Sequence, residues 1–257
     1  FLDNVLDVTS YPLPEIEELS KKWRRVGLGF TALADTFAML GMNYGSEESK
    51  HFSEELAKTF SRAAYRASIE LAKEKGAFEA LDIEKYLNGK FIKSVLGPKE
   101  VANIRKYGIR NIAMLTIAPT GTTSLSVGQN CYSGIEPIFS LSYDRRIRTG
   151  NGDETKTETV YDYAYLKWQT RMPHNTTDAM RRMDNPFSTT FDVDPYDAID
   201  IQAIFQKYWD HSISKTANLP TGYSFEQYKG LFMYAYKKGL KGFTSFNPEG
   251  SLKPILQ

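Results

Sequence analysis

Four hydroxyl side chains surround one glycine in the stretch Ala118–Ser124, and their types and spacing could hold an anion. The hydroxyls belong to Thr120, Thr122, Thr123 and Ser124. Gly121 can adopt backbone angles that other residues avoid, and it lets an anion approach main-chain N–H groups closely. The stretch follows an apolar run, 111–118, that is typical of a strand. The sequence therefore predicts a phosphate-binding loop at the carboxyl end of a strand, where ligands of α/β sheets usually bind.

The chemistry expected of this loop is binding without transfer. The loop lacks the lysine of a nucleotide-hydrolysing P-loop, so the phosphate would be held in position while the reaction takes place elsewhere on the ligand. A tight turn followed by a helix N-cap is the simpler interpretation of the same pattern. The pattern by itself leaves both interpretations open.

The composition of the chain excludes several classes of function. With 257 residues, 41% of them hydrophobic, the chain can form one large α/β domain or two smaller ones. Lys and Arg number 32 against 31 Asp and Glu, so no global field attracts nucleic acid or an anionic membrane surface. No apolar run approaches the length of about 18 residues that a membrane-spanning helix needs. We expect a soluble, cytoplasmic protein and, because the chain begins at Phe1, a piece of a longer one.

Residues that could bind metals or act as nucleophiles are few. Cys131 is the single cysteine, which excludes an internal disulfide and a cysteine-cluster metal site within the chain. The three histidines, His51, His174 and His211, are too scattered for a metal-binding motif such as H-E-x-x-H. We therefore predict no metal site.

Helical periodicity is clearest in the first half of the chain. A buried helix is expected within 28–41, and a long amphipathic helix should run from an N-cap at Ser46 to Lys75 and stop at Gly76. Apolar residues recur at helical spacing on this long helix and should form its buried face: Phe52, Leu56, Phe60 and Ala63. A shorter helix should begin at Pro98.

The last quarter of the chain predicts a βαβ unit. A strand over 215–220, a helix beginning at Ser224 and a strand over 242–246 would form a parallel pair with a right-handed crossover. Ser224 and Gln227 fit a capping box at the start of the helix. A further helix before this unit carries apolar side chains on one face: Ile201, Phe205 and Tyr208.

Residues 144–195 are polar and rich in turn-forming residues, and we expect an irregular segment there apart from one helix near 160–168. We expect this segment to belong to a single domain that spans 1–257.

Several stretches, in order along the chain, resemble the catalytic chain of the ribonucleotide reductases, most closely the adenosylcobalamin-dependent class. They are FLDNVLDVTSYPLPEIEE, RRVGLGFTALADTFAMLG, LTIAPTGTTSLSVG with SGIEPIFSLSYDRRI, IQAIFQKYWDHSISKTANLP and AYKKGLKGFTSF. The resemblance covers most of the chain except the polar stretch before Asp194. The final strand has Thr244, Ser245 and Phe246 where reductases with a separate iron subunit carry a tyrosine pair. This difference favours the cobalamin class, which makes its radical locally.

The resemblance implies an α/β fold that forms the carboxyl-terminal half of a ten-stranded α/β barrel, with parallel strands and surrounding helices. In this family a cysteine thiyl radical attacks the ribose, a cysteine pair supplies electrons, and the cofactor of this class is adenosylcobalamin. These groups lie on family segments that precede this chain, and one cysteine cannot supply three thiols. The chain is thus expected to be part of an enzyme that converts ribonucleotides to deoxyribonucleotides, to lack catalytic residues and to be inactive without the amino-terminal half.

The resemblance also assigns the candidate site. Substrate phosphate would be bound by Thr120, Gly121, Thr122, Thr123 and Ser124, with Ala118 and Pro119 lining the sugar side. Fixing the phosphate would hold the ribose at reactive distance from the thiyl group. Cys131 is expected to be a buried small side chain without a redox role. Glu136 could brace the loop by pairing with one of three arginines: Arg145, Arg146 and Arg148.

The partners implied are a ribonucleotide substrate, the amino-terminal half of the reductase and an external dithiol reductant such as thioredoxin. A homodimer is also expected, because the open sheet edge of a half-barrel needs cover. A competing interpretation is a non-catalytic nucleotide-binding or assembly module derived from the same barrel. A sugar-phosphate enzyme with a (β/α)₈ barrel is disfavoured, because the chain predicts too few strands.

Overall fold

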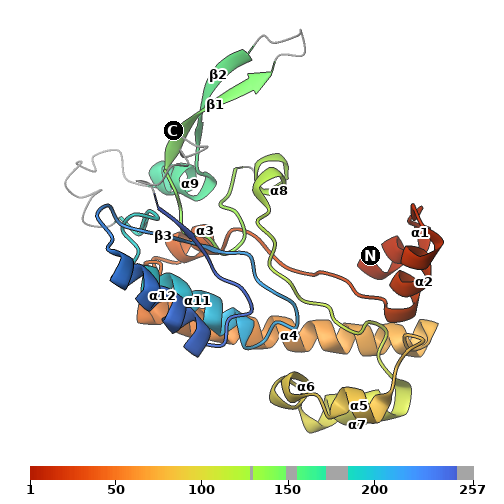
Figure 1. Cartoon of the computed structure of the whole chain (residues 1–257). Coiled ribbons are helices and arrows are strands. Elements are labelled where there is room, and N and C mark those ends of the chain that lie inside the picture. Colours follow the sequence, from red (N-terminus) through yellow and green to blue (C-terminus); the bar gives the residue numbers. More distant parts are fainter. Residues whose placement is uncertain (128–129, 149–154, 172–184, 248–257) are drawn as a thin grey trace. The chain divides into compact units, whose positions relative to one another are not determined.

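The computed structural model describes residues 1–127, 130–148, 155–171 and 185–247, with the side chains of 145–148 left out (Figure 1). The chain divides into two compact units. Unit 1 comprises Phe1–Gly29, Phe52–Ile117 and Ile204–Ile213, and unit 2 comprises Phe30–His51, Ala118–Ala203 and Ser214–Gln257. Each unit therefore draws on segments that are far apart in the sequence, and the single domain expected for 1–257 stays a prediction.

Unit 1 is mainly helical. Its helices are α1 (Leu2–Val8), α2 (Pro14–Trp23), α4 (Glu47–Lys75, of which the first residues belong to unit 2), α5 (Ile83–Leu87), α6 (Lys90–Val95) and α7 (Pro98–Tyr107). The helix expected at Pro98 is confirmed as α7, and Pro14 opens α2 in the same way. Proline suits this first position because the amide it lacks would have no partner inside the helix.

Helix α4 confirms the expected long helix. The Ser49 amide donates to the Ser46 hydroxyl at 3.2 Å, and the helix ends before Gly76, whose φ is +85°. Its buried face differs from the prediction. Two large side chains, Tyr65 and Ile69, are fully buried there, and small residues form the rest of the face: Ser53, Ala57, Ser61, Ala64, Ser68 and Ala72. The expected residues Phe52, Leu56 and Phe60 are only half-buried and Ala63 is exposed. Small side chains allow a neighbouring backbone to approach, and the Arg110 amide donates to the Ser68 carbonyl at 3.1 Å.

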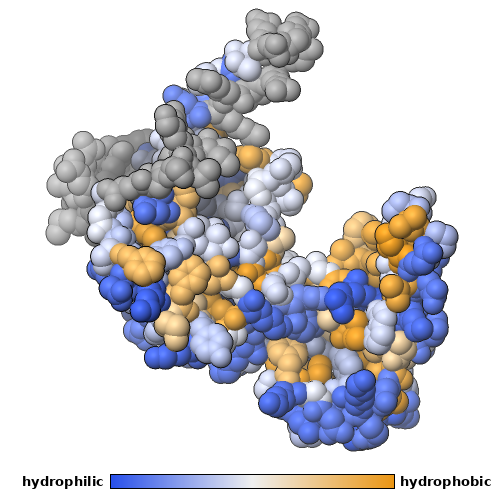
Figure 2. Space-filling model, in the orientation of Figure 1, coloured by the Kyte–Doolittle hydropathy of each residue, from blue (hydrophilic) through white to orange (hydrophobic). Residues whose placement is uncertain are grey.

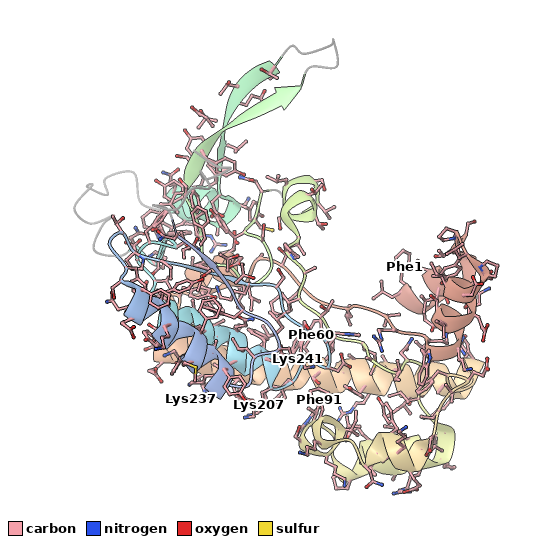
Figure 3. The ribbon with its side chains drawn as sticks, viewed as in Figure 1. Phe1, Phe60, Phe91, Lys207, Lys237 and Lys241 are labelled. Carbon is pink, nitrogen blue, oxygen red and sulfur yellow. The ribbon has the colours of Figure 1, made fainter. Side chains whose placement is uncertain are left out.

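An aromatic pair packs beside this stripe of small residues. The Phe60 ring on α4 (Figure 3) stacks on the Trp209 ring with 5.5 Å between centroids. Phe60 is therefore half-buried because one face of its ring covers the fully buried Trp209.

The strand expected over 111–118 is shorter than predicted. The segment is extended and makes isolated parallel bridges on two sides, Leu28 with Leu115 and Ile117 with Ile213. The Asp210 carboxylate accepts the Leu115 amide at 2.7 Å, in the place of a neighbouring strand. A side chain thus satisfies part of the backbone that a longer strand pair would have satisfied.

Among the described residues, unit 2 contains the other helices and four strands. The helices are α3 (Leu33–Met39), α8 (Gly121–Ser126), α9 (Tyr163–Arg171), α11 (Pro195–Gln206, ending in unit 1) and α12 (Phe225–Lys237). The strands are β1 (Ser142–Arg148), β2 (Thr155–Tyr161), β3 (Thr216–Asn218) and β4 (Thr244–Phe246). The buried helix expected within 28–41 is present as α3, but it begins late because Ala32 has a φ of 67°.

Strands β1 and β2 form an antiparallel hairpin within the segment 144–195, where an irregular chain was expected. Side chains of β2 are mostly exposed, so its polar sequence has the composition of a loop even though its backbone is paired. The helix expected near 160–168 is confirmed as α9.

The predicted βαβ unit is confirmed. Strands β3 and β4 pair in parallel, with α12 between them in sequence. The Ser224 hydroxyl accepts the Gln227 amide at 3.3 Å, and the Gln227 side chain accepts the Ser224 amide at 2.9 Å. The apolar core beside this βαβ unit consists of Ile199, Leu219, Leu231 and Ala235.

The mixture of helices and parallel strand pairs agrees with the α/β class. Among the described residues the sheets are two-stranded and no closed barrel is formed, so the half-barrel stays a prediction. No helix in the described part of the chain combines the length and the apolar character needed to cross a membrane.

Candidate functional site

The predicted phosphate loop lies in unit 2 and leads into the short helix α8. Ala118 and Pro119 are exposed, and Thr120 precedes the helix with φ 48° and ψ 20°. The left-handed backbone therefore occurs at Thr120 and not at Gly121, where the sequence placed the conformational freedom. Gly121 instead lies at an open position, because a Cβ built there would meet no heavy atom within 4 Å.

The first turn of α8 presents backbone donors. The Ser124 amide donates to the Thr120 carbonyl at 2.8 Å, so the amides of Gly121, Thr122 and Thr123 precede the first intrahelical bond. These three amides make no other hydrogen bond within the part of the chain that the structure describes. Thr122 and Thr123 are exposed, and their hydroxyls can supplement the amides. Such a group of donors suits an anion.

The other two hydroxyls of the loop serve its internal structure. The Thr120 hydroxyl donates to Thr31 at 3.0 Å and accepts the Gly134 amide at 2.8 Å. The Ser124 side chain is fully buried, and its hydroxyl lies 2.8 Å from that of Thr31. Thr31 also donates to the Tyr132 carbonyl at 2.8 Å. Thr31 is thus the centre of a hydrogen-bond network that holds the loop. No sequence pattern predicts this role, because the partners of Thr31 are distant along the chain.

Two buried carboxyl groups lie behind this network. Asp35 and Asp162 are 3% and 1% exposed, and each accepts one backbone amide at 2.8 Å, from Tyr132 and Tyr165 respectively. Burial, with the neighbouring Asp35 carboxyl, raises the pKa of Asp162 to about 8. Neither acid was singled out from the sequence. No spacing rule connects a residue in α3 with one that precedes α9.

Glu136 forms an ion pair at the start of β3, and its expected pairing with an arginine that braces the loop stays a prediction. Its Oε2 lies 3.1 Å from Lys215 Nζ, and its Oε1 accepts the Thr216 amide at 2.6 Å. The Lys215 side chain is 1% exposed, so Glu136 neutralises a buried charge at the start of β3. The expected arginines, Arg145, Arg146 and Arg148, have side chains outside the described residues.

Among the remaining candidates, Cys131 lies beside the loop network, where its thiol interacts with the Thr31 and Ser124 side chains. Cys131 is half-buried, where full burial was expected, and burial and the Asp35 charge raise the pKa of its thiol. A raised pKa disfavours the thiolate that redox chemistry needs. His51 is exposed, and His174 lies outside the described residues. No group of three or more His, Cys, Asp or Glu side chains suited to a metal occurs in the described ranges.

A family model described as "Ribonucleotide reductase, barrel domain" matches residues 1–246. The chain is 31% identical to a vitamin B12-dependent ribonucleoside-diphosphate reductase of Mycobacterium tuberculosis, over 96% of this chain and 34% of that protein. It is 28% identical to the protein of the same name from Thermoplasma acidophilum, over 100% of this chain and 32% of that protein. A ribonucleoside-diphosphate reductase subunit alpha of Chlamydia pneumoniae is 28% identical over 93% of this chain. The chain thus spans about a third of the length of the first two relatives.

Proposed function

The chain belongs to the family of ribonucleotide reductase barrel domains, and from this premise we propose that it holds the substrate phosphate in a vitamin B12-dependent ribonucleotide reductase. The observation that carries the proposal is the set of three adjacent amides, of Gly121, Thr122 and Thr123, that precede the first bond of α8 beside an open position. The names of the two vitamin B12-dependent relatives specify a ribonucleoside diphosphate, and we propose the same substrate class for this chain.

The loop residues would have two different roles in binding. The amides and hydroxyls of Thr122 and Thr123, with the Gly121 amide, would contact the phosphate directly. Thr120 and Ser124 would act through Thr31 by holding the turn in shape. Ala118 and Pro119 are exposed immediately before the turn and would line the sugar side.

The contribution to reduction would be positional. A diphosphate held by several short hydrogen bonds fixes the ribose, and such fixation can supply several kcal/mol of a reaction barrier, on the order of 7–11 kcal/mol in the best cases. With Cys131 as its single cysteine, this chain would leave the thiyl radical and the reducing pair to the rest of the enzyme. We propose that it is inactive in ribonucleotide reduction without that part.

The cofactor of such an enzyme would be adenosylcobalamin, which supplies a radical when bound. The described residues of this chain do not fit a corrin. The Nε2 atom of His211 is buried without a hydrogen-bond partner among the described residues, so it is not presented at the surface where a corrin could bind. The donors of the phosphate loop suit an anion and not a metal. No step of the reaction is therefore assigned to this chain through the cofactor.

The proposed partners are the remaining part of the reductase, a second copy of the chain and an external dithiol such as thioredoxin. Apolar side chains are exposed on helices α1 and α2 and at the residues that precede them: Phe1, Val8, Leu13 and Leu19. Figure 2 shows hydrophobic colour over this part of the molecule. Phe1 is 95% exposed at the start of α1 (Figure 3). Exposed apolar side chains of this kind support the proposal that further protein covers them.

Calorimetric titration with a ribonucleoside diphosphate such as ADP tests the binding proposal. Gly121→Val should weaken binding by about tenfold or more, because the added side chain fills the open position without requiring a new backbone angle. Gly242→Val is the matched control, since Gly242 also has open space and no positive φ. Equal binding by the wild-type and Gly121→Val proteins, or no binding by the wild type, would refute an autonomous phosphate site.

A further inference from the structure

Asp35 and Asp162 are brought together by the starts of two helices. Asp35 lies in the first turn of α3, and Asp162 immediately precedes α9. Helices α3 and α9 pack against each other within unit 2. Asp162 Oδ1 accepts the Tyr165 amide, so this side chain caps α9, while Asp35 Oδ2 accepts the Tyr132 amide from the loop network. Each acid therefore uses one oxygen to hold a backbone segment.

The second oxygen of each acid has no such partner. Asp35 Oδ1 and Asp162 Oδ2 are buried and accept no hydrogen bond from any described residue. The two side chains lie within hydrogen-bond reach of each other. Two ionised carboxylates have no hydrogen to place between them, and burying both charges side by side is strongly unfavourable. One proton between the two carboxyls satisfies both atoms at once.

The surroundings also favour a single negative charge on the pair. The titratable groups that face it are the Cys131 thiol beside Asp35 and the Tyr132 phenol beside Asp162, with the Tyr143 phenol of β1 beyond Tyr132. Burial raises the pKa of both Cys131 and Tyr132, so these two groups are neutral near pH 7. Neither carboxyl forms a salt bridge with a described residue. The helix starts stabilise one charge, but no cation among these groups offsets a second one.

The pair is connected to the phosphate loop through the hydrogen bonds of Tyr132 and Thr31. The Tyr132 amide is held by Asp35, and the Tyr132 carbonyl accepts the Thr31 hydroxyl at 2.8 Å and the Ala32 amide at 2.9 Å. Thr31 in turn holds the hydroxyls of the loop residues Thr120 and Ser124. The carboxyl pair and the loop therefore share one continuous polar network.

We propose that Asp35 and Asp162 share one proton and that the protonated pair is a positioning unit for the phosphate loop. In naming phosphate as the ligand, this inference rests on the proposed function. Loss of the proton would place two like charges in contact, separate α3 from the start of α9, and shift the Tyr132 segment that anchors Thr31.

The sign of the pH effect follows from the burial of the acid. The pKa of Asp162 rises from an ordinary 3.8 to about 8 in the folded chain, so the folded state binds more protons than the unfolded state between these values. The stabilising effect of the shared proton is complete below about pH 4 and is lost progressively as the pH rises to about 8.

Carboxyl ¹³C NMR of the chain without ligand tests the inference directly. We expect one carboxyl of the pair to titrate near pH 8, and the amide shifts of Tyr132 and Gly134 to follow the same midpoint. Asp162→Asn should remove that titration and leave both amides constant with pH, because its amide nitrogen can donate permanently to Asp35. Asp82→Asn is the matched control, since Asp82 caps α5 from an exposed position, and this variant should titrate like the wild type.

Two results would overturn the inference. Titration of both carboxyls near pH 4 would show that they share no proton at neutral pH. A carboxyl that titrates near pH 8 while the Tyr132 and Gly134 amides stay constant would show that the pair does not position the loop.

A separate titration distinguishes this inference from the proposed function. ADP affinity of the wild type should fall by about tenfold between pH 7 and pH 9, and that of Asp162→Asn by less than about twofold. Equal falls in both proteins would refute positioning of the ligand site by the pair. Absence of ADP binding at every pH, with the coupled NMR titration intact, would refute the phosphate site and leave the proton-sharing pair established.

Discussion

The βαβ unit at the end of the chain and the proposed phosphate loop lie in the same compact unit but are stabilised by different means. The βαβ unit is held by a capping box of residues three apart and by an apolar core centred on Leu231. The loop is held by hydrogen bonds of the Thr31 hydroxyl and the Gly134 amide to its hydroxyls, and Asp35 accepts the amide of Tyr132, whose carbonyl accepts the Thr31 hydroxyl. One region is thus specified locally by its sequence, and the other only when distant segments meet.

The difference teaches how a loop can be held in shape without an apolar core. Each hydrogen bond in such a network contributes only about 0.5–1.5 kcal/mol net, but leaving a buried partner unsatisfied costs about 1–3 kcal/mol. The network should therefore be more sensitive to loss of one hydroxyl than its modest bond energies indicate. Substitutions in the two regions can test this contrast.

The largest effect is expected at the ion pair that joins the two regions. Glu136→Gln should destabilise the chain by about 3 kcal/mol in urea unfolding, because it leaves the buried Lys215 ammonium without a counter-charge. Glu226→Gln is the matched control, since the Glu226 side chain is 79% exposed and its pair with Lys229 is long, at 3.8 Å. The control should lose less than about 0.5 kcal/mol. Similar losses in both variants would show that burial of Lys215 is not important.

A slightly smaller effect is expected in the βαβ core. Leu231 is fully buried, and Leu231→Ala should reduce the free energy of unfolding by about 2–3 kcal/mol through lost burial and the cavity it leaves. Met233→Ala on the same helix removes a side chain that is 49% exposed. This variant should change the free energy of unfolding by less than about 1 kcal/mol. Both values come from chemical denaturation. If the two losses were equal, the apolar core would not be the source of stability here.

The loop network should respond to a single lost hydroxyl. Thr31→Val keeps the shape of the side chain but leaves the Gly134 amide and the Thr120 and Ser124 hydroxyls with fewer partners, at a cost of about 2 kcal/mol. Faster hydrogen exchange of the Gly134 amide is the measurement that localises the change. Thr36→Val removes one hydroxyl that bonds only within its own helix, and its effect should be small. Unchanged exchange at Gly134 in Thr31→Val would contradict the assigned network.

The smallest effect is expected at the helix cap. Ser224→Ala removes the acceptor for the Gln227 amide and should lower stability by about 1 kcal/mol. Ser224→Asp retains an acceptor and should restore most of the loss. Thermal unfolding followed by circular dichroism measures both variants. A Ser224→Asp protein as unstable as Ser224→Ala would argue against the cap.

Local patterns explain how much of the fold was predictable. Ser46 and Gly76 mark the ends of α4, Pro98 marks the start of α7, and Ser224 with Gln227 marks α12. In each case the residues that predict a helix end lie within one or two turns of that end in the structure. The buried face of α4 was predicted wrongly because the large residues Tyr65 and Ile69 were not assigned to it, and because the small residues that let a backbone approach carry no strong apolar signal.

Long-range polar pairs explain what was not predictable. The loop was located from its glycine and hydroxyls. The roles of those hydroxyls depend on Thr31, which precedes Thr120 by 89 residues in the sequence. The pair of Asp35 with Asp162 and that of Glu136 with Lys215 likewise join separate segments. Their sequence neighbourhoods contain no periodic or capping signal. Only the folded chain shows which acid meets which partner.

The left-handed backbone of Thr120 has a consequence for ligand entry. A β-branched residue in this conformation stores strain of about 1–3 kcal/mol, which glycine would avoid. The hydroxyl contacts of Thr120 hold the strained turn before any ligand arrives, so an incoming anion would meet preorganised amides and would lose little entropy in ordering them.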